Sequence, residues 1–232
     1  VRQEEDAQKE GDGVRWLAAM HDTPAQKLLR SHGALARGVE ILQQTKGAGQ
    51  VAQAVAMALS RCAHSEVSAR ALVVLDTAEA ATPLIAFAPL PGESQPATIG
   101  RQAAGVMLLR ALAAHPSGVP HIANTPAALP ALCEMLAAPN LAVAAGAADG
   151  LGSCLVLVDA RPILVAAGAG NGLRQLKERA SKMGHRHAKE TAEEVLALLE
   201  PPGSEAPLRK REEMSSEERF FAAMAKGSGI TS

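Results

Sequence analysis

Apolar residues recur along this chain at helical spacing, and they do so in pairs of segments. The first segments of the pairs are 33–42, 80–88, 127–136 and 170–180, and the second segments are 51–63, 100–114, 141–155 and 187–200. Equivalent positions in the four copies lie 47, 47 and 44 residues apart, namely Ala36, Pro83, Pro130 and Arg174. Self-similarity at such a period is typical of stacked helical repeats. The pattern therefore predicts an all-α protein of about four repeats.

A third, shorter helix is predicted ahead of most of these pairs. The segments concerned are 22–33, 117–125 and 159–168. Each has a proline early in the segment, where a missing N–H removes no intrahelical hydrogen bond. Thr23 and Asp159 are suited to N-capping, and Gly33 and Gly168 are suited to a left-handed helix end. Each repeat is thus predicted to be one short helix followed by two longer ones.

The two ends of the chain differ in composition from the repeats. Residues 1–13 are polar and are predicted to be disordered, whereas the repeats are expected to cover 14–200. The start of that range, 14–20, resembles the end of a repeat helix, which predicts a truncated extra repeat at the N-terminus. Residues 201–232 are predicted to form a mostly disordered tail, with a short amphipathic helix near 215–226 that begins with a capping box.

The composition of the chain limits its fold class, its binding partners and its compartment. Hydrophobic residues make up 47% of the chain but aromatic residues only 2%, which favours helices of Ala and Leu over a β-sandwich. The net charge of −1 supplies no bulk field for nucleic acid or an anionic membrane, and no apolar run is long enough to span a bilayer. Three dispersed cysteines, Cys62, Cys133 and Cys154, indicate a reducing compartment and buried thiols. We expect a cytoplasmic protein, or a nuclear one.

The stretch PILVAAGAGNGL, residues 162–173, raises the question of a nucleotide site. The glycines Gly168, Gly170 and Gly172 form GxGxG rather than GxGxxG, and no P-loop lysine follows. Aligned with the other copies, the stretch falls at the turn between the short helix and the second helix of the last repeat. We therefore predict a turn there, with no cofactor.

Candidate catalytic and metal-binding residues are few. His185 and His187 are two residues apart, so on a helix they face different directions and do not form a bidentate metal site. Ser153 and Cys154 could pair with Asp149 as a nucleophile and an acid, but no histidine occupies a neighbouring helical position. The sequence therefore predicts no enzyme, no metal and no small-molecule substrate.

The order of these helices resembles that of the armadillo-repeat family. The segment AALPALCEMLAAPNLAVAAGAADGLGSCL, from residue 127, follows the family's second and third helices closely, and VAQAVAMALSRCA, from residue 51, resembles a third helix. The resemblance implies a right-handed α–α superhelix of about four repeats over roughly 14–200. HEAT repeats are the near alternative, and the short first helix favours the armadillo type.

The resemblance also implies where a partner would bind. In armadillo proteins the third helices line a concave groove, and relatives that clamp extended peptides carry repeated Trp and Asn residues there. The Trp positions here hold Met57, Met107, Asp149 and Glu194, and the Asn positions hold Arg61, Ala111, Ser153 and Leu198. Because that ladder is absent, we expect a ligand other than basic extended peptides.

The expected function is a non-catalytic module or scaffold that binds a partner protein through the groove. The residues expected to contact the partner are Met57, Arg61, Met107, Asp149, Ser153 and Glu194. A chaperone cofactor, acting as a nucleotide exchange factor for a 70-kDa heat-shock protein, is the alternative, since some armadillo-like proteins have that role.

Overall fold

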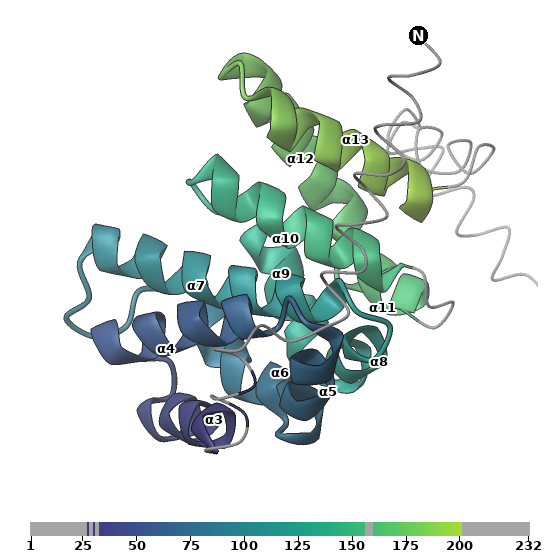
Figure 1. Cartoon of the computed structure of the whole chain (residues 1–232). Coiled ribbons are helices and arrows are strands. Elements are labelled where there is room, and N and C mark those ends of the chain that lie inside the picture. The colour runs from purple at the N-terminus through teal and green to yellow at the C-terminus, as the bar shows by residue number, and fades with distance from the viewer. Residues whose placement is uncertain (1–26, 28–29, 31–32, 156–159, 201–232) are drawn as a thin grey trace, which may run out of the picture.

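The computed structural model describes residues 27, 30, 33–155 and 160–200 (Figure 1). Over these residues the chain is entirely helical, with eleven α-helices, one 3₁₀-helix and no strand. The predicted all-α class is therefore confirmed for the described part. The predictions for 1–13, for 14–20, for the tail at 201–232 with its helix near 215–226, and for the caps Thr23 and Asp159 lie outside the described residues.

The helices follow one another in groups of three, as the sequence pattern predicts. Their bounds in chain order are α3 (Ala34–Thr45), α4 (Gly49–Cys62), α5 (Glu66–Val74), α6 (Thr77–Ala81), η1 (Thr82–Ile85), α7 (Gln95–Ala113), α8 (Gly118–Asn124), α9 (Ala128–Met135), α10 (Leu141–Cys154), α11 (Ala160–Ala166), α12 (Ala169–Lys182) and α13 (Arg186–Leu199). The predicted third helices correspond to α4, α7, α10 and α13. The predicted second helices correspond to α3, to α6 with η1, to α9 and to α12.

One connection differs from the prediction. The sequence indicates a helical segment at 80–88 followed by an extra loop, whereas the structure ends η1 at Ile85 and begins α7 at Gln95. Ser94 caps α7, because its side chain accepts a hydrogen bond from the Ala97 N–H. Pro96 then occupies the first turn, where a proline is tolerated. The loop therefore lies at 86–94.

The third helices contact one another in chain order, α4 with α7, α7 with α10 and α10 with α13 (Figure 1). Glycines let α7 and α10 approach closely. The position that a Cβ would take on Gly146 lies 2.9 Å from Val106 Cγ1, and the equivalent position on Gly150 lies 3.9 Å from Arg110 Cα. Since residue 106 faces 146 and residue 110 faces 150, the two helices run in the same direction.

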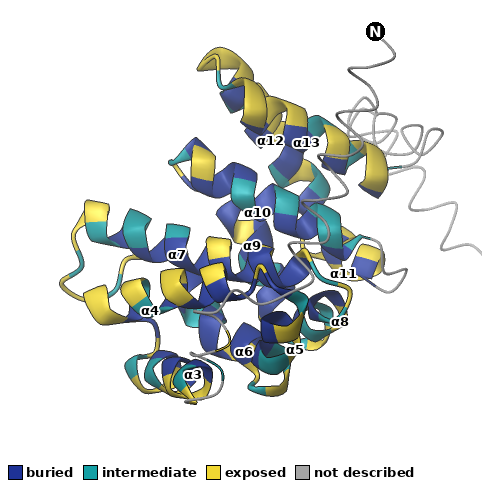
Figure 2. Cartoon of the chain, viewed as in Figure 1, coloured by how far each residue is buried: buried dark blue, intermediate teal, exposed yellow. Residues whose placement is uncertain are grey.

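The core consists mainly of leucine and alanine side chains. Leu109 on α7 and Leu151 on α10 are fully buried, as helical periodicity predicts for both. All three cysteines are buried in the interior, which confirms the expected burial of Cys62 and Cys154. Figure 2 shows that buried residues concentrate around α7, α9 and α10, while exposed residues gather on the outer sides of α12–α13 and α3–α4. The middle of the chain thus supplies most of the core.

The predicted turn between two helices is present but short, at residues 167–168, whereas Gly170 and Gly172 lie in the first turn of α12. Gly168 has φ of 77° and precedes α12, while the preceding segment PILVAA lies in α11 and the turn that follows it. This left-handed conformation favours glycine because other residues place a Cβ against the backbone. Gly33 has φ of 68° at the equivalent position before α3. Two copies of the repeat therefore share the same backbone turn.

Candidate functional site

The six residues predicted to contact a partner lie on the four successive third helices. Met57 and Arg61 belong to α4, Met107 to α7, and the remaining three to α10 and α13. The side chains of Met57 and Met107 are 40% and 44% exposed, and Arg61 is exposed as well. Because α4 and α7 pack against each other, these three residues lie on two neighbouring helices. We refer to the exposed residues of α4, α7, α10 and α13 as the third-helix face.

On α10 the predicted residues already have partners within the chain. The carboxylate of Asp149 forms an ion pair with Arg110 of α7, and the Ser153 hydroxyl donates to the Asp149 carbonyl oxygen at 3.2 Å. Arg110, which the sequence reasoning did not single out, therefore belongs to this part of the face. Glu194 on α13 is exposed.

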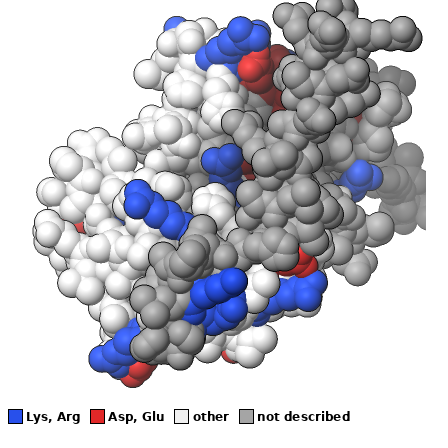
Figure 3. Space-filling view, viewed as in Figure 1, with Lys and Arg blue, Asp and Glu red and all other residues white. Residues whose placement is uncertain are grey.

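Two apolar residues extend the third-helix face beyond the predicted set. Val51 near the start of α4 is 61% exposed, and Leu198 near the end of α13 is 53% exposed. Apolar residues at positions that face away from the buried stripe of an amphipathic helix would have identified both. Figure 3 shows the molecule from the same side as Figure 1. In this view most of the described surface carries no charge, and the basic groups stand apart from one another. The face is therefore mixed apolar and polar, with isolated charges.

The possible nucleophile on α10 is not activated by its surroundings. Burial raises the pKa of the Cys154 thiol to about 11, so the thiol stays protonated near neutral pH and lacks the reactive thiolate form. Burial likewise raises the pKa of Cys133 to about 12. The neighbouring Ser153 donates its proton to a backbone carbonyl instead of to a base.

The two histidines of GHRH take separate roles. His187 is exposed, whereas His185 is half-buried and caps α13, its Nδ1 accepting a hydrogen bond from the Ala188 N–H at 3.2 Å. The sequence also suggests that both histidines are solvated loop residues, but His185 is a half-buried helix cap and His187 lies in the first turn of α13. Within the described ranges, no group of three or more His, Cys, Asp or Glu residues is arranged to hold a metal ion.

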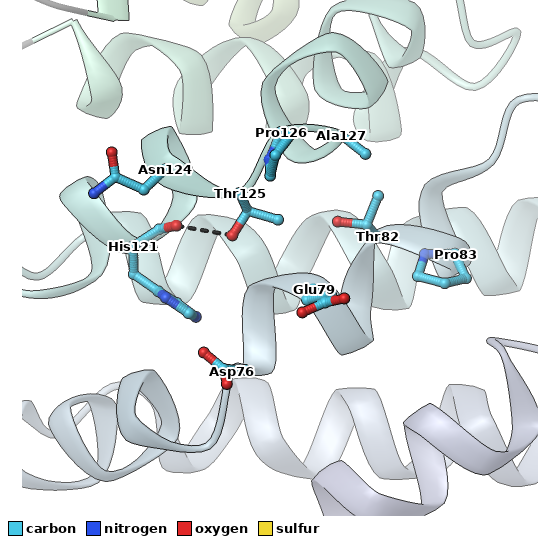
Figure 4. Close-up of a pocket in the computed structure, with 9 residues that line it drawn as sticks. All are labelled: Asp76, Glu79, Thr82, Pro83, His121, Asn124, Thr125, Pro126 and Ala127. Carbon is cyan, nitrogen blue, oxygen red and sulfur yellow. Dashed lines mark hydrogen bonds between the residues drawn. The ribbon is translucent and has the colours of Figure 1, made fainter.

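A pocket of about 520 Å³ lies away from the third-helix face, between α6 with η1 and the turn from α8 to α9 (Figure 4). Asp76 and Glu79 come from the α6 side, and His121, Asn124 and Thr125 from the α8 side. The Thr125 hydroxyl donates to the His121 carbonyl oxygen at 2.9 Å. The groups left to meet a ligand are the two carboxylates and the Asn124 amide.

His121 in this pocket has a structural role. Its Nε2 accepts a hydrogen bond from the Ala78 N–H at 3.2 Å, in the first turn of α6. Burial lowers the pKa of His121, although the nearby Asp76 carboxylate acts in the opposite direction. An imidazole nitrogen that already accepts a backbone proton is not available as a general base. His121 is therefore not available as a base for Thr125.

A buried ion pair holds the loop at 86–94 against α7. The Arg101 side chain is fully buried, and its Nε donates to Glu93 Oε1 at 3.0 Å. Its other nitrogens donate to the carbonyl oxygens of Leu84 at 2.7 Å, Ala86 at 3.1 Å and Ala88 at 3.0 Å. Such a pair is retained only where further hydrogen bonds satisfy both ions, and here they fix the path of the loop.

Glu93 is held in its charged form by the same network. Burial by itself would raise its pKa, but the hydrogen bonds from Arg101, the Leu90 N–H and the Thr98 hydroxyl outweigh that effect and lower the pKa below the usual value. The sequence offers one signal for this network. Arg101 and Gln102 are consecutive polar residues in an otherwise apolar helix, and Glu93 lies in the extra loop before them.

No protein-family model matches the chain, and no curated protein matches it at a significant level. Among the helices of the described ranges, none combines the length and the apolar character needed to cross a membrane.

Proposed function

We propose that this chain is a non-catalytic protein-binding module, built as an armadillo-like right-handed solenoid, whose third-helix face receives a partner protein. The observation that carries the proposal is the pair of half-exposed methionines, Met57 and Met107, on neighbouring helices and beside Arg61. Methionine is flexible and polarizable, so it adapts to irregular apolar partners. Arginine is enriched at the energetically important positions of interfaces.

Three features support the solenoid arrangement. From α5 onwards the helices recur in groups that end with a long third helix, the third helices touch in chain order, and α7 and α10 run in the same direction. In a repeat stack each unit buries its apolar face against its neighbours. The same arrangement would bring Met57, Met107, Asp149 and Glu194 to one side. Three cysteines that lie far apart in the sequence and are buried in the structure are consistent with a reducing compartment such as the cytoplasm.

The absence of an activated nucleophile on α10 supports a binding role over a catalytic one. The Cys154 thiol is protonated at neutral pH, and the Asp149 carboxylate is occupied by Arg110. The third-helix face instead carries exposed apolar side chains, at Val51, Met57 and Met107. An interface needs such groups at its centre, surrounded by polar groups at the rim.

The test compares two triple variants of the full chain as baits in extracts of the source cells. The first carries Met57→Asp, Arg61→Glu and Met107→Asp. The control carries matched changes away from that face, Val74→Asp on α5, Val165→Asp on α11 and Arg37→Glu on α3. The first two control residues are 82% and 59% exposed. Circular dichroism first establishes that both variants remain helical.

The expected result is a set of proteins that the wild-type chain and the control variant both retain and that the first variant loses. Each retained protein is then purified and its affinity is measured by titration calorimetry. Partners that bind all three baits equally would place the interaction outside the third-helix face and would contradict the proposal.

A further inference from the structure

We infer that a second pocket, at the start of α7, is a binding site for a tryptophan side chain of a partner protein. This pocket of about 380 Å³ has Phe87, Pro89, Ile99 and Pro139 among its lining residues. Gln102 also lines it and is only 3% exposed. Ligand sites of this size are lined mainly by apolar groups, with a few fixed polar groups that decide the specificity. Here the Gln102 amide is the polar group in question.

The orientation of the Gln102 amide follows from its hydrogen bonds. Its Nε2 donates to the carbonyl oxygens of Ala86 at 3.2 Å and Phe87 at 3.1 Å. Because both of those groups accept only, the amide nitrogen must face them and the amide oxygen must face away. Within the described residues that oxygen accepts no hydrogen bond, and it is not one of their fully enclosed unpaired atoms. It is therefore an acceptor that is open to the pocket.

The loop that builds the pocket is held in place before any ligand arrives. Arg101 and Gln102 together bind the carbonyl oxygens of Ala86, Phe87 and Ala88. Phe87 remains 44% exposed, because its backbone, and not its ring, is what these hydrogen bonds fix. A preformed pocket loses less conformational entropy on binding than one that must order itself.

Charge complementarity selects the occupant. The lining residues carry no formal charge, and three of them are polar, Gln95, Thr98 and Gln102. Gln95 is exposed, and the Thr98 hydroxyl donates to Glu93 and to the Ser94 carbonyl oxygen. Gln102 is therefore the buried group with an acceptor to offer, and the complementary group is neutral and apolar with one donor. Because Gln102 is only 3% exposed, the donor is expected to come from a side chain that enters the pocket and not from the backbone of the partner. Among neutral side chains, only the indole of tryptophan combines an apolar body with a donor and no acceptor.

The binding test uses isolated ring compounds so that no substitution of Gln102 is needed. Indole and indene have nearly the same shape, but indene has a CH₂ group where indole has the N–H donor. Each is titrated into the isotope-labelled full chain while the Ile99 methyl and Gln102 side-chain amide signals are followed by NMR. Indole is expected to shift both signals in a saturable way and to bind roughly two- to tenfold more tightly than indene.

Two variants locate the site. Phe87→Ala removes one wall of the pocket and is expected to weaken the binding of both compounds severalfold. Val74→Ala, a truncation at another exposed apolar residue, is expected to leave both affinities unchanged. Equal affinities for indole and indene would overturn the pairing with Gln102, and the absence of saturable shifts at Ile99 would overturn the site.

The chain's own Trp16 and a second copy of the chain are the competing occupants. If Trp16 filled the pocket, Trp16→Phe would shift the Ile99 signal before any compound is added and would tighten indole binding. If a second copy filled it, the same signal would depend on protein concentration. Either result would overturn the assignment to a partner protein. The test is independent of the third-helix face, because Met57→Asp and Met107→Asp leave this lining intact.

Discussion

Individual leucines of the central helices carry much of the packing. Leu109 of α7 and Leu151 of α10 have no exposed surface, whereas Met107 on α7 is 44% exposed. We predict that Leu109→Ala or Leu151→Ala lowers the free energy of unfolding by about 2–5 kcal/mol, because each leaves a cavity. Met107→Ala on the surface should change it by less than about 0.5 kcal/mol. Urea denaturation measures all three, and three equal midpoints would contradict the burial described here.

Two helical glycines, Gly118 in α8 and Gly150 in α10, should change the stability of the chain in opposite directions when they are replaced by alanine. At Gly118 a Cβ would lie 2.0 Å from the Leu112 carbonyl oxygen, a backbone atom that cannot move aside. At Gly150 the nearest atom would be Arg110 Cα at 3.9 Å, an ordinary contact. Gly118→Ala is therefore expected to destabilise the chain by about 3 kcal/mol, and Gly150→Ala to stabilise it by up to about 1 kcal/mol through helix propensity. Thermal unfolding of both variants in parallel gives the two signs.

For individual residues, the sequence predicts which apolar side chains are buried but not which polar side chains are buried. Leu109, Leu151 and Cys154 could be placed in the core because helical periodicity puts them on the buried side. Arg101 could not, since arginine is almost never fully buried without partners. Its partners are carbonyl oxygens of the loop at 86–94, and no local pattern shows where a loop backbone will lie. The open Gln102 acceptor was missed for the same reason.

At the scale of helices, α8 caps a helix of the preceding group. Asp76 precedes α6 in a left-handed conformation with φ of 53° and makes no side-chain cap. His121 supplies the missing acceptor from α8, through Nε2 to the Ala78 N–H. The contact between two groups of helices therefore depends on a neutral imidazole. Asp76 and Glu79 are the charged groups that line the same pocket.

This contact should make stability depend on pH. The pKa of His121 is lowered in the folded chain, so the unfolded chain, with a pKa of about 6.5, takes up the proton first. The contribution of His121 is fully present above that unfolded pKa and is lost as the pH falls through the folded pKa. We predict that the wild-type chain loses more stability than His121→Gln between about pH 7.5 and pH 5.

Denaturant titrations of both proteins across this range measure the difference, and the other six histidines cancel in the comparison. Parallel stability curves for the two proteins would mean that His121 does not titrate through this contact.

The helices themselves could be predicted closely, and the errors have a local cause. The expected third helices at 141–155 and 187–200 agree with α10 and α13 within one residue at each end. The error near 80–97 is that the sequence predicts a helical segment at 80–88 and a loop at 89–97, whereas in the structure Pro83 and Pro96 each lie in the first turn of a helix. Proline marks a helix start as readily as a break. The distinction depends on Ser94, whose capping is visible only in the structure.

At the scale of the whole molecule, α10 is surrounded and the terminal helices are not. Among the described helices, α10 contacts α7, α8, α9, α12 and α13, whereas α13 contacts only α10 and α12 to a comparable extent. We predict that amide hydrogens of α7 and α10 exchange at rates near the limit of global unfolding, and that those of α13 and α3 exchange faster through local opening. Native-state hydrogen exchange with mass spectrometry resolves these helices. Uniform protection from α3 to α13 would indicate a single cooperative unit instead.

The loop at 86–94 has a consequence for how such a chain can change over evolutionary time. Its residues are bonded to α7 and η1 within their own group of helices, and the later groups repeat at nearly the same interval as if the loop were absent. A lineage could therefore lengthen, shorten or replace this connection without realigning the helices on either side. Any substitute loop would have to supply hydrogen-bond acceptors for the buried Arg101 side chain. The loop could then acquire specificity for a new ligand while the helices of the core are inherited unchanged.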